Sequence, residues 1–120
     1  MKIAVSAKGN ELSSQVDPRF GRAAYFIIYN TDDDSFESVS NQDGAAAAQG
    51  AGIQAAQTVA NKQVDWVISG NMGPRAFTSL KAAGVKIASW GEGTVEEAIK
   101  LIEEGKLKEI SGANVQGHWQ

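Results

Sequence analysis

Residues 64–80 read VDWVISGNMGPRAFTSL. The apolar run at 64–68 is typical of a buried strand, and a small-residue turn leads from it into a helical pattern that starts at Pro74. Proline is favoured in the first turn of a helix because no partner exists there for its missing N–H. The turn therefore brings free backbone N–H groups, the positive end of the helix dipole and the Arg75 guanidinium close to one point. This local chemistry indicates binding of an anion and gives no sign of bond breaking.

The residues that follow complete a βαβ unit. We expect the helix to end at Gly84 and the apolar run 85–89 to form the next strand, parallel to the first through a right-handed crossover. Residues 94–97 read TVEE, a capping box that opens a last helix, and Gly105 ends that helix. Its inward face is predicted to consist of Val95, Ala98, Ile99 and Ile102.

The amino-terminal half predicts three strands and one long connection. Residues 2–7 form a first strand, and residues 24–30 and 35–40 form an antiparallel hairpin through a polar turn. Residues 8–23 join the first strand to this hairpin, and a connection of that length in a compact domain is usually functional or mobile.

The middle of the chain is rich in alanine and glycine. Residues 53–60 predict a helix, with Ile53, Ala56, Val59 and Ala60 on its inner face. The alanines at 45–48 either extend this helix or form a flexible lid, and the glycines at 50 and 52 favour the lid.

Composition limits the classes of function. A length of 120 residues, 42% hydrophobic and 21% charged, fits one globular domain, and the net charge of -3 argues against general nucleic-acid binding. The chain has no cysteine, no apolar run of membrane-spanning length and no signal-peptide pattern at its start, so we expect a cytoplasmic protein without membrane contact.

These elements predict an α/β protein with about five strands and helices on both faces of the sheet. Ligands of such sheets lie at the carboxyl ends of the strands, where neighbouring connections diverge. We therefore expect the loop after the first strand and the turn after Ser69 to share one crevice, with Lys8, Asn10 and residues 50–52 as a mobile rim.

Four ordered segments carry a family resemblance: MKIAVSA (1–7), VDPRFGRA (16–23), GAGIQAA (50–56) and SGNMGPRAF (69–77). Together they resemble the dinitrogenase iron–molybdenum cofactor biosynthesis domain family, up to about residue 105. The resemblance implies a ribonuclease-H-like three-layer α/β/α domain over residues 1–120, with a flexible tail from about 111. It further implies a mixed five-stranded sheet in the order 3-2-1-4-5 whose second strand is antiparallel. Family members related to nitrogenase maturation, and so to nitrogen fixation, bind or carry iron–molybdenum cofactor or its precursors.

Two segments supply the candidate site. Arg19 and Arg22 flank Phe20 and Gly21 as guanidinium donors for an anion, and the alternative is a structural turn whose phenylalanine fills the core. The turn after Ser69 lines the crevice, or it is only a tight connection in which Met72 packs and Asn71 caps the helix. The predicted cofactor-binding residues are Arg19, Phe20, Gly21, Arg22, Gly70, Asn71, Met72, Gly73 and Arg75.

Metal ligands are few. The single histidine, His118, either completes the coordination of a cluster held mainly by charge or is a solvated tail residue. The three aspartates at 32–34 lack the ligand spacing of a calcium loop and indicate a solvated turn.

Catalysis has no convincing machinery in this sequence. The first strand carries no carboxylate for two-metal nuclease chemistry, no Ser–His or Cys–His pair is evident, and no phosphate loop of the Walker type follows a strand. We therefore expect a non-enzymatic carrier of an iron–molybdenum-type metal–sulfur cluster or a related small anion, with a protein partner in cluster assembly as a further candidate. A metal-free regulatory or interaction module on the same scaffold is the alternative, and a phosphate- or nucleotide-binding enzyme component is a weaker third.

Overall fold

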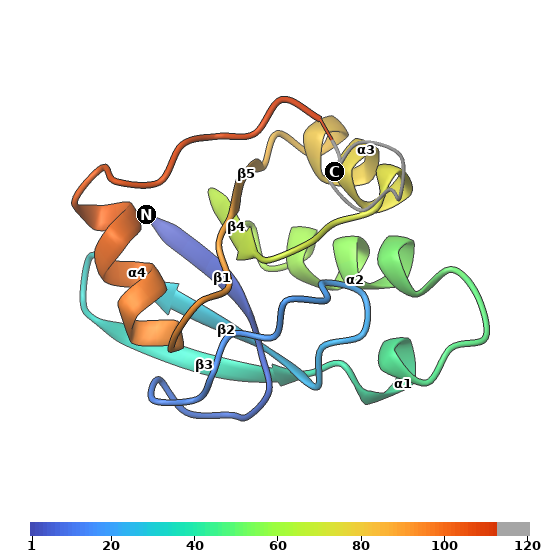
Figure 1. Cartoon of the computed structure of the whole chain (residues 1–120), viewed down its shortest axis with the longest axis horizontal. Coiled ribbons are helices and arrows are strands. Elements are labelled where there is room, and N and C mark those ends of the chain that lie inside the picture. Colours follow the sequence, from blue (N-terminus) through green and yellow to red (C-terminus); the bar gives the residue numbers. More distant parts are fainter. Residues whose placement is uncertain (113–120) are drawn as a thin grey trace.

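The computed structural model describes residues 1–112. These residues form five strands and four helices (Figure 1). The strands are β1 (Lys2–Ala7), β2 (Tyr25–Asn30), β3 (Ser35–Ser40), β4 (Trp66–Ser69) and β5 (Lys86–Ser89), and the helices are α1 (Gln42–Ala45), α2 (Ala51–Ala60), α3 (Pro74–Ala82) and α4 (Val95–Glu103).

The five strands form one sheet in the order β3-β2-β1-β4-β5. The second strand runs antiparallel to both its neighbours, while β1, β4 and β5 are parallel. The order and the reversed second strand confirm the predicted fold class. Because β1 and β4 are adjacent and parallel, the long loop after Ala7 and the turn after Ser69 both leave the sheet at the carboxyl ends of these strands.

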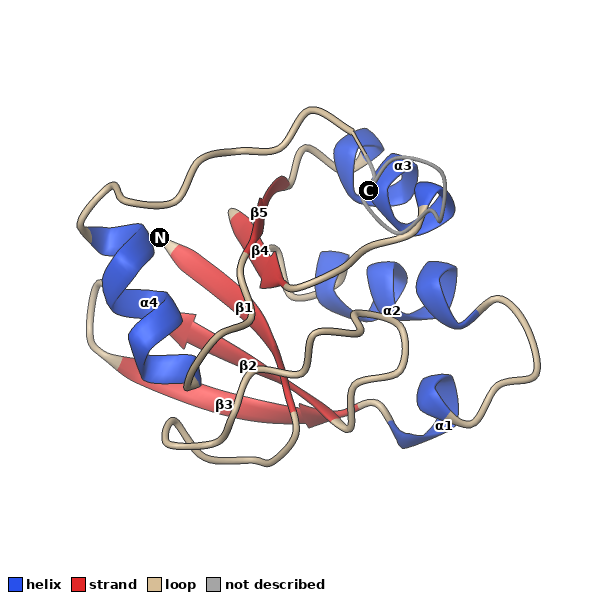
Figure 2. Ribbon diagram, in the orientation of Figure 1, coloured by secondary structure: helices blue, strands red, loops and turns tan. Residues whose placement is uncertain are grey.

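Helices cover the two faces of this sheet unequally (Figure 2). Helices α2 and α3 lie on one face and α4 lies on the other. The side chains of β1 alternate between the two layers: Ala4 packs with α2 and α3, whereas Ile3 and Val5 pack with α4. Each layer therefore has its own apolar core, and the buried central strand separates them.

Capping signals in the sequence set the helix ends. Thr94 accepts a hydrogen bond from the Glu97 N–H, and the Glu97 carboxylate accepts one from the Thr94 N–H, so the predicted capping box is present. Gly84 and Gly105 follow α3 and α4 with φ of 80° and 71°, which confirms both predicted stops. The predicted inward residues of α4 are all buried.

The middle of the chain differs from expectation in detail. Helix α2 begins two residues early, and its buried face contains Ala55, while Ile53 and Ala60 are only half-buried. The alanines at 45–48 do not extend α2, because α1 ends at Ala45 and a loop follows it. The predicted inner face is correct at Ala56 and Val59 and wrong at the other two positions, because alanine carries too little side chain to make the periodicity distinct.

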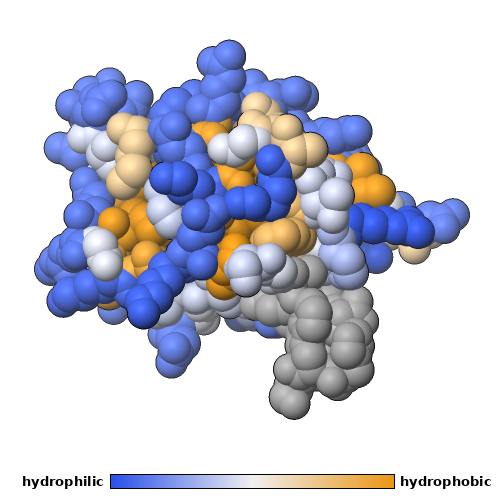
Figure 3. Space-filling model, turned by 90° about the horizontal axis from the view of Figure 1, so that it is seen from above, coloured by the Kyte–Doolittle hydropathy of each residue, from blue (hydrophilic) through white to orange (hydrophobic). Residues whose placement is uncertain are grey.

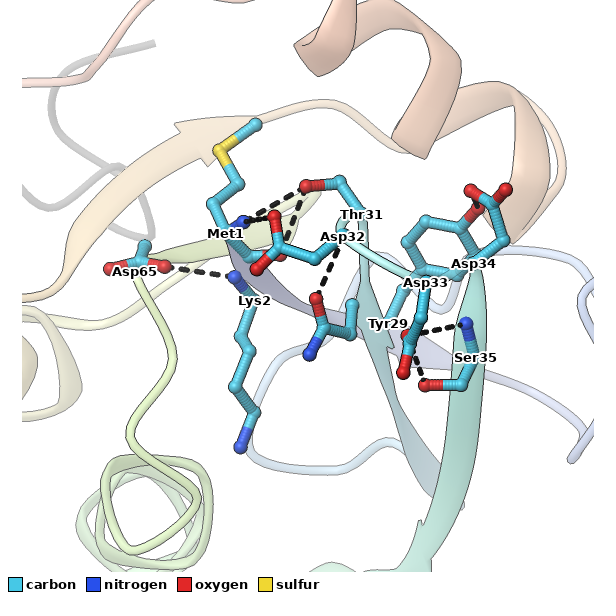
Figure 4. A network of polar contacts seen from close by, with 10 residues as sticks. Met1, Lys2, Tyr29, Thr31, Asp32, Asp33, Asp34, Ser35 and Asp65 are labelled. Carbon is cyan, nitrogen blue, oxygen red and sulfur yellow. Dashed lines mark hydrogen bonds and ion pairs between the residues drawn. The ribbon is translucent and has the colours of Figure 1, made fainter.

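At the opposite end of the strands from the crevice, beside the amino-terminal end of β1, several separate polar contacts surround the β2–β3 turn (Figure 4). The Met1 ammonium lies 3.4 Å from the Asp32 carboxylate, and the Tyr29 hydroxyl donates to Asp34 at 2.6 Å. Asp33 accepts hydrogen bonds from the backbone and hydroxyl of the residue two positions later. Each carboxylate has its own protein donor, so they do not converge on a cation.

None of the helices in the described part of the chain is long and apolar enough to cross a bilayer. Figure 3 shows a largely hydrophilic face on which apolar side chains appear in separate spots. The large hydrophobic residues that are exposed within residues 1–112 are Met1 and Phe36.

Candidate functional site

The two loops expected to meet are hydrogen-bonded to each other. The Asn71 N–H donates to the Pro18 carbonyl at 2.6 Å, and the Phe20 N–H donates to the Asn71 carbonyl at 3.3 Å. The approach depends on a missing side chain, since a Cβ on Gly70 would lie 2.7 Å from the Pro18 Cα. The second half of the long loop and the turn after β4 therefore form one rim.

A buried polar network fixes this rim to the sheet. The Ser6 hydroxyl lies 2.7 Å from the Asp17 carbonyl and 2.8 Å from the Ser69 hydroxyl, and all three residues are almost fully buried. The Asp17 N–H also donates to the Ser6 carbonyl at 2.9 Å. The ends of β1 and β4 thus hold the start of the loop in place, because buried polar groups are costly to leave without partners.

Two helix N-termini face the same space. Helix α2 follows Gly50, which has φ of 77°, and α3 follows Gly73, and no side chain caps either helix. The first turns touch closely: a Cβ on Gly52 would lie 3.3 Å from the Ala76 Cβ. Uncapped first turns leave backbone N–H donors and positive dipole ends available to a ligand.

Three adjoining cavities make up the crevice between these segments. The central cavity, of about 300 Å³, lies between Phe20 and Gly21, the start of α2 and the start of α3. A second, of about 340 Å³, extends it toward Arg19, Arg22 and Asn71. A third, of about 430 Å³, extends it along α3 past Thr78. The sizes suit a small ligand.

Three arginines give the crevice its positive charge, and they differ in their hydrogen-bond and ion-pair partners. Arg19 is paired with the buried Asp17 carboxylate at 3.2 Å, and this hydrogen bond and charge raise the pKa of the guanidinium. Arg22 donates through Nη1 to the carbonyls of Ala45 and Ala47. Arg75 makes no ion pair with any residue in 1–112.

No carboxylate offsets these cations at the cavity walls. Within the described residues, the walls of the three cavities include no aspartate or glutamate. The Asp17 carboxylate is buried and already paired with Arg19. The arrangement can therefore hold an anion by backbone N–H groups and guanidinium donors.

The predicted site residues fall into two groups. Those at the cavity walls are Arg19, Phe20, Gly21, Arg22, Asn71, Gly73 and Arg75. Met72 is instead 2% exposed within the core layer of α2 and α3, which supports its packing alternative, and Gly70 serves the close contact with Pro18. Phe20 does both, because it is buried against Phe26 with ring centroids 5.2 Å apart and also forms the floor of the crevice. His118 lies outside the described residues.

The expected rim is only partly in place. Residues 50–52 line the crevice, but Lys8 and Asn10 do not. The first half of the long loop turns toward α4 instead: Lys8 donates to Gln15, and Val95 at the start of α4 donates to Ser14. The polar pattern of residues 8–15 carried no signal for this division of the loop.

The sequence did not predict the roles of three contributors to the site. Ile53 and Pro74 form apolar wall of the crevice, although Ile53 had been assigned to the core. Asn41 is buried and donates through Nδ2 to the carbonyls of Ala23, at 2.9 Å, and Gly21, at 3.3 Å. A lone asparagine after a strand is a common turn residue, so its role in holding the loop had no distinguishing pattern.

Comparison with known proteins agrees with this architecture. Residues 1–105 match the family model described as dinitrogenase iron-molybdenum cofactor. An uncharacterized protein of Methanocaldococcus jannaschii is 32% identical over 112 residues, which is 92% of each chain. The apo form of the orange protein from Desulfovibrio gigas is 38% identical with a TM-score of 0.92, over 94% of this chain and 95% of that one. A Thermotoga protein of the DUF35 family, solved by NMR, is 42% identical with a TM-score of 0.84, over 97% of this chain and 98% of that one. The protein belongs to the dinitrogenase iron-molybdenum cofactor family.

Proposed function

We propose that this protein is a non-enzymatic carrier that holds an anionic metal–sulfur cluster of the iron–molybdenum type, or a related metal-containing anion. The observation that carries the proposal is the crevice itself: two uncapped helix N-termini and three arginines surround a space without a carboxylate wall. Membership of the family supports the kind of cargo. The orange protein relative was solved in an apo form, which supports a binding role for this scaffold.

The cluster would be held mainly by the positive charge of the arginines and by the dipoles of backbone N–H groups. The first turns of α2 and α3 both line the cavity, and Arg75, in the first turn of α3, lines it too and makes no competing ion pair among the described residues. Phe20, Ile53 and Pro74 add apolar wall, which suits the weakly hydrated sulfide surface of a cluster better than a strongly hydrated oxyanion.

A second candidate is a metal-free regulatory or interaction module. One observation favours it: residues 1–112 contain no group of three or more histidine, cysteine, aspartate or glutamate side chains arranged to hold a metal ion. His118, outside those residues, would then have no ligand role. The same crevice would bind a metal-free anion or a partner's acidic segment.

Anaerobic equilibrium dialysis against tetrathiomolybdate, the simplest molybdenum–sulfur dianion, tests the proposal. We expect binding to the wild type, and a loss of affinity of about tenfold for Arg75→Gln, because one charge-assisted hydrogen bond contributes about 1.5–3 kcal/mol. Lys100→Gln is the matched control, since it removes one positive charge from exposed α4 on the opposite face. Equal losses in both variants, or no binding by the wild type, would contradict the proposal.

His118→Ala separates the carrier from its alternative. If the imidazole completes cluster coordination, this variant retains tetrathiomolybdate binding but, when ferrous iron is added to the anaerobic dialysis, takes up less iron than the wild type, as measured by elemental analysis of the dialysed protein. A protein partner that binds the ligand-free form, with no uptake of molybdenum, would favour the metal-free module.

A further inference from the structure

The Arg22 side chain joins two parts of the molecule. Its Nη1 donates to the Ala45 carbonyl at 2.9 Å and to the Ala47 carbonyl at 2.6 Å. A guanidinium Nη carries two N–H groups, so both are used by these acceptors. The remaining Nε and Nη2 donors have no hydrogen-bond partner among residues 1–112.

The acceptors lie at the start of a strap, which we define as residues 45–50, from the last residue of α1 to the residue before α2. The strap joins α1 to α2 and bows away from the body of the molecule (Figure 1). Its backbone hydrogen bonds lie at its two ends. At the start, the N–H groups of residues 45, 46 and 47 donate to the carbonyls of Asn41, Gln42 and Gly44, and at the end the Gly50 carbonyl accepts from the Gln54 N–H. α1 is a helix of only four residues, so Arg22 is the main tie between the strap and the crevice loop.

The strap and the crevice are also continuous along the chain. The strap ends at Gly50, the residue before α2, and the first turn of α2 forms one wall of the cavity that Arg22 lines. One side chain therefore donates to the strap through Nη1 and also lines the crevice.

We propose that Arg22 couples the strap to the crevice: Nη1 holds the strap carbonyls while Nε and Nη2 bind the anion. This inference rests on the proposed anion-binding function. The strap positions the planar guanidinium before the ligand arrives, and the ligand in turn restrains the strap. Because coupling between two sites is reciprocal, loosening the strap weakens anion binding by the same factor by which the anion tightens the strap.

Amide hydrogen exchange at Ala46 and Ala47, followed by NMR with and without saturating tetrathiomolybdate, tests the coupling. We expect the dianion to slow exchange in the wild type by about threefold or more, and Arg22→Gln to exchange faster without ligand and to lose the response. Arg75→Gln is the matched control, because it removes a crevice guanidinium that does not touch the strap: its ligand-free exchange stays at the wild-type rate. Faster exchange on ligand binding would show that the anion pulls Arg22 off the strap, and would overturn the proposal.

The reciprocal effect is measured from the strap side. Ala46→Gly adds backbone freedom to the strap and should weaken tetrathiomolybdate binding by about threefold, while Ala82→Gly, exposed at the end of α3, should leave it unchanged. Bound tetrathiomolybdate with unchanged exchange at Ala46 and Ala47 would overturn the coupling and leave the carrier function standing. Absence of binding in dialysis would overturn both.

Discussion

Single glycines allow the backbone segments of the crevice to touch. A Cβ on Gly21 would lie 2.9 Å from the Gly52 nitrogen, and a Cβ on Gly70 would lie 2.7 Å from the Pro18 Cα. In both cases the atom approached is backbone, which cannot rotate away. The start of α2 and the loop after β1 can therefore form one wall only if these positions carry no side chain.

Gly21→Ala should separate the loop from α2. The new methyl group meets the backbone of residues 51–52, so we expect a loss of about 1–3 kcal/mol in the free energy of unfolding and weaker tetrathiomolybdate binding. Urea unfolding and equilibrium dialysis measure the two effects. Gly112→Ala is the control, because a Cβ there meets nothing within 4 Å. If Gly21→Ala behaves like this control, the close contact does not shape the crevice.

Tyr29 gives a pH-dependent prediction away from the crevice. Its hydrogen bond to Asp34 raises the pKa of the phenol to about 12. The unfolded chain releases this proton at about pH 10, so the contribution to stability is full below that pH and is lost as the pH rises toward 12.

Ultraviolet titration of the phenolate in a Tyr25→Phe background checks this value. Asp34→Gly removes the acceptor and suits the backbone, whose φ is 58° there, so the Tyr29 pKa should fall toward its ordinary value. The same titration midpoint with and without the Asp34 carboxylate would contradict the assigned cause.

Among the elements, α4 has the most complete sequence signal. Its capping box, its inward face and its glycine stop were all predicted and are all confirmed. The signal is local, because each of these features depends on residues within one or two turns of one another. α2 lacks such a signal: its N-cap is a glycine, its first turn is alanine and glycine, and its inner face was predicted only in part.

Thr94→Ala tests the contribution of the cap. We expect a loss of about 1 kcal/mol in the free energy of unfolding, because the Glu97 N–H loses its acceptor. The thermal midpoint should fall, whereas Thr78→Ala in the exposed middle of α3 should change it little. Equal effects of the two threonine changes would show that the cap contributes nothing specific.

The same cap predicts a direction with pH. Hydrogen bonds from Thr94 lower the pKa of the Glu97 carboxyl, so its stabilising effect is present above the ordinary carboxyl pKa and is lost as the pH falls through the lowered value. Acid unfolding curves of the wild type and Glu97→Gln should therefore converge at low pH, where both side chains are neutral. A gap between the curves that stays constant with pH would exclude a role for the ionised carboxylate.

At the scale of the whole molecule, the sheet order and the meeting of two loops followed from the pattern of strands together with the family resemblance. The parallel pairing of β1 and β4 places the loop after β1 and the turn after β4 together at the carboxyl ends of these strands. What the sequence did not show are contacts across the fold: the first half of the long loop packing on α4, and Asn41 holding the crevice loop. These depend on which surfaces meet after folding, and a single sequence has no local pattern that records them.

We have proposed that an anionic metal–sulfur ligand binds in the crevice at the carboxyl ends of β1 and β4. Mapping backbone amide shifts by NMR during an anaerobic titration with tetrathiomolybdate tests it most directly. We expect the largest shifts at residues 20–21, 51–53 and 75–76, where the loop and both helix N-termini line the cavity. Largest shifts at the β2–β3 turn or along α4, or no shifts at all, would contradict it.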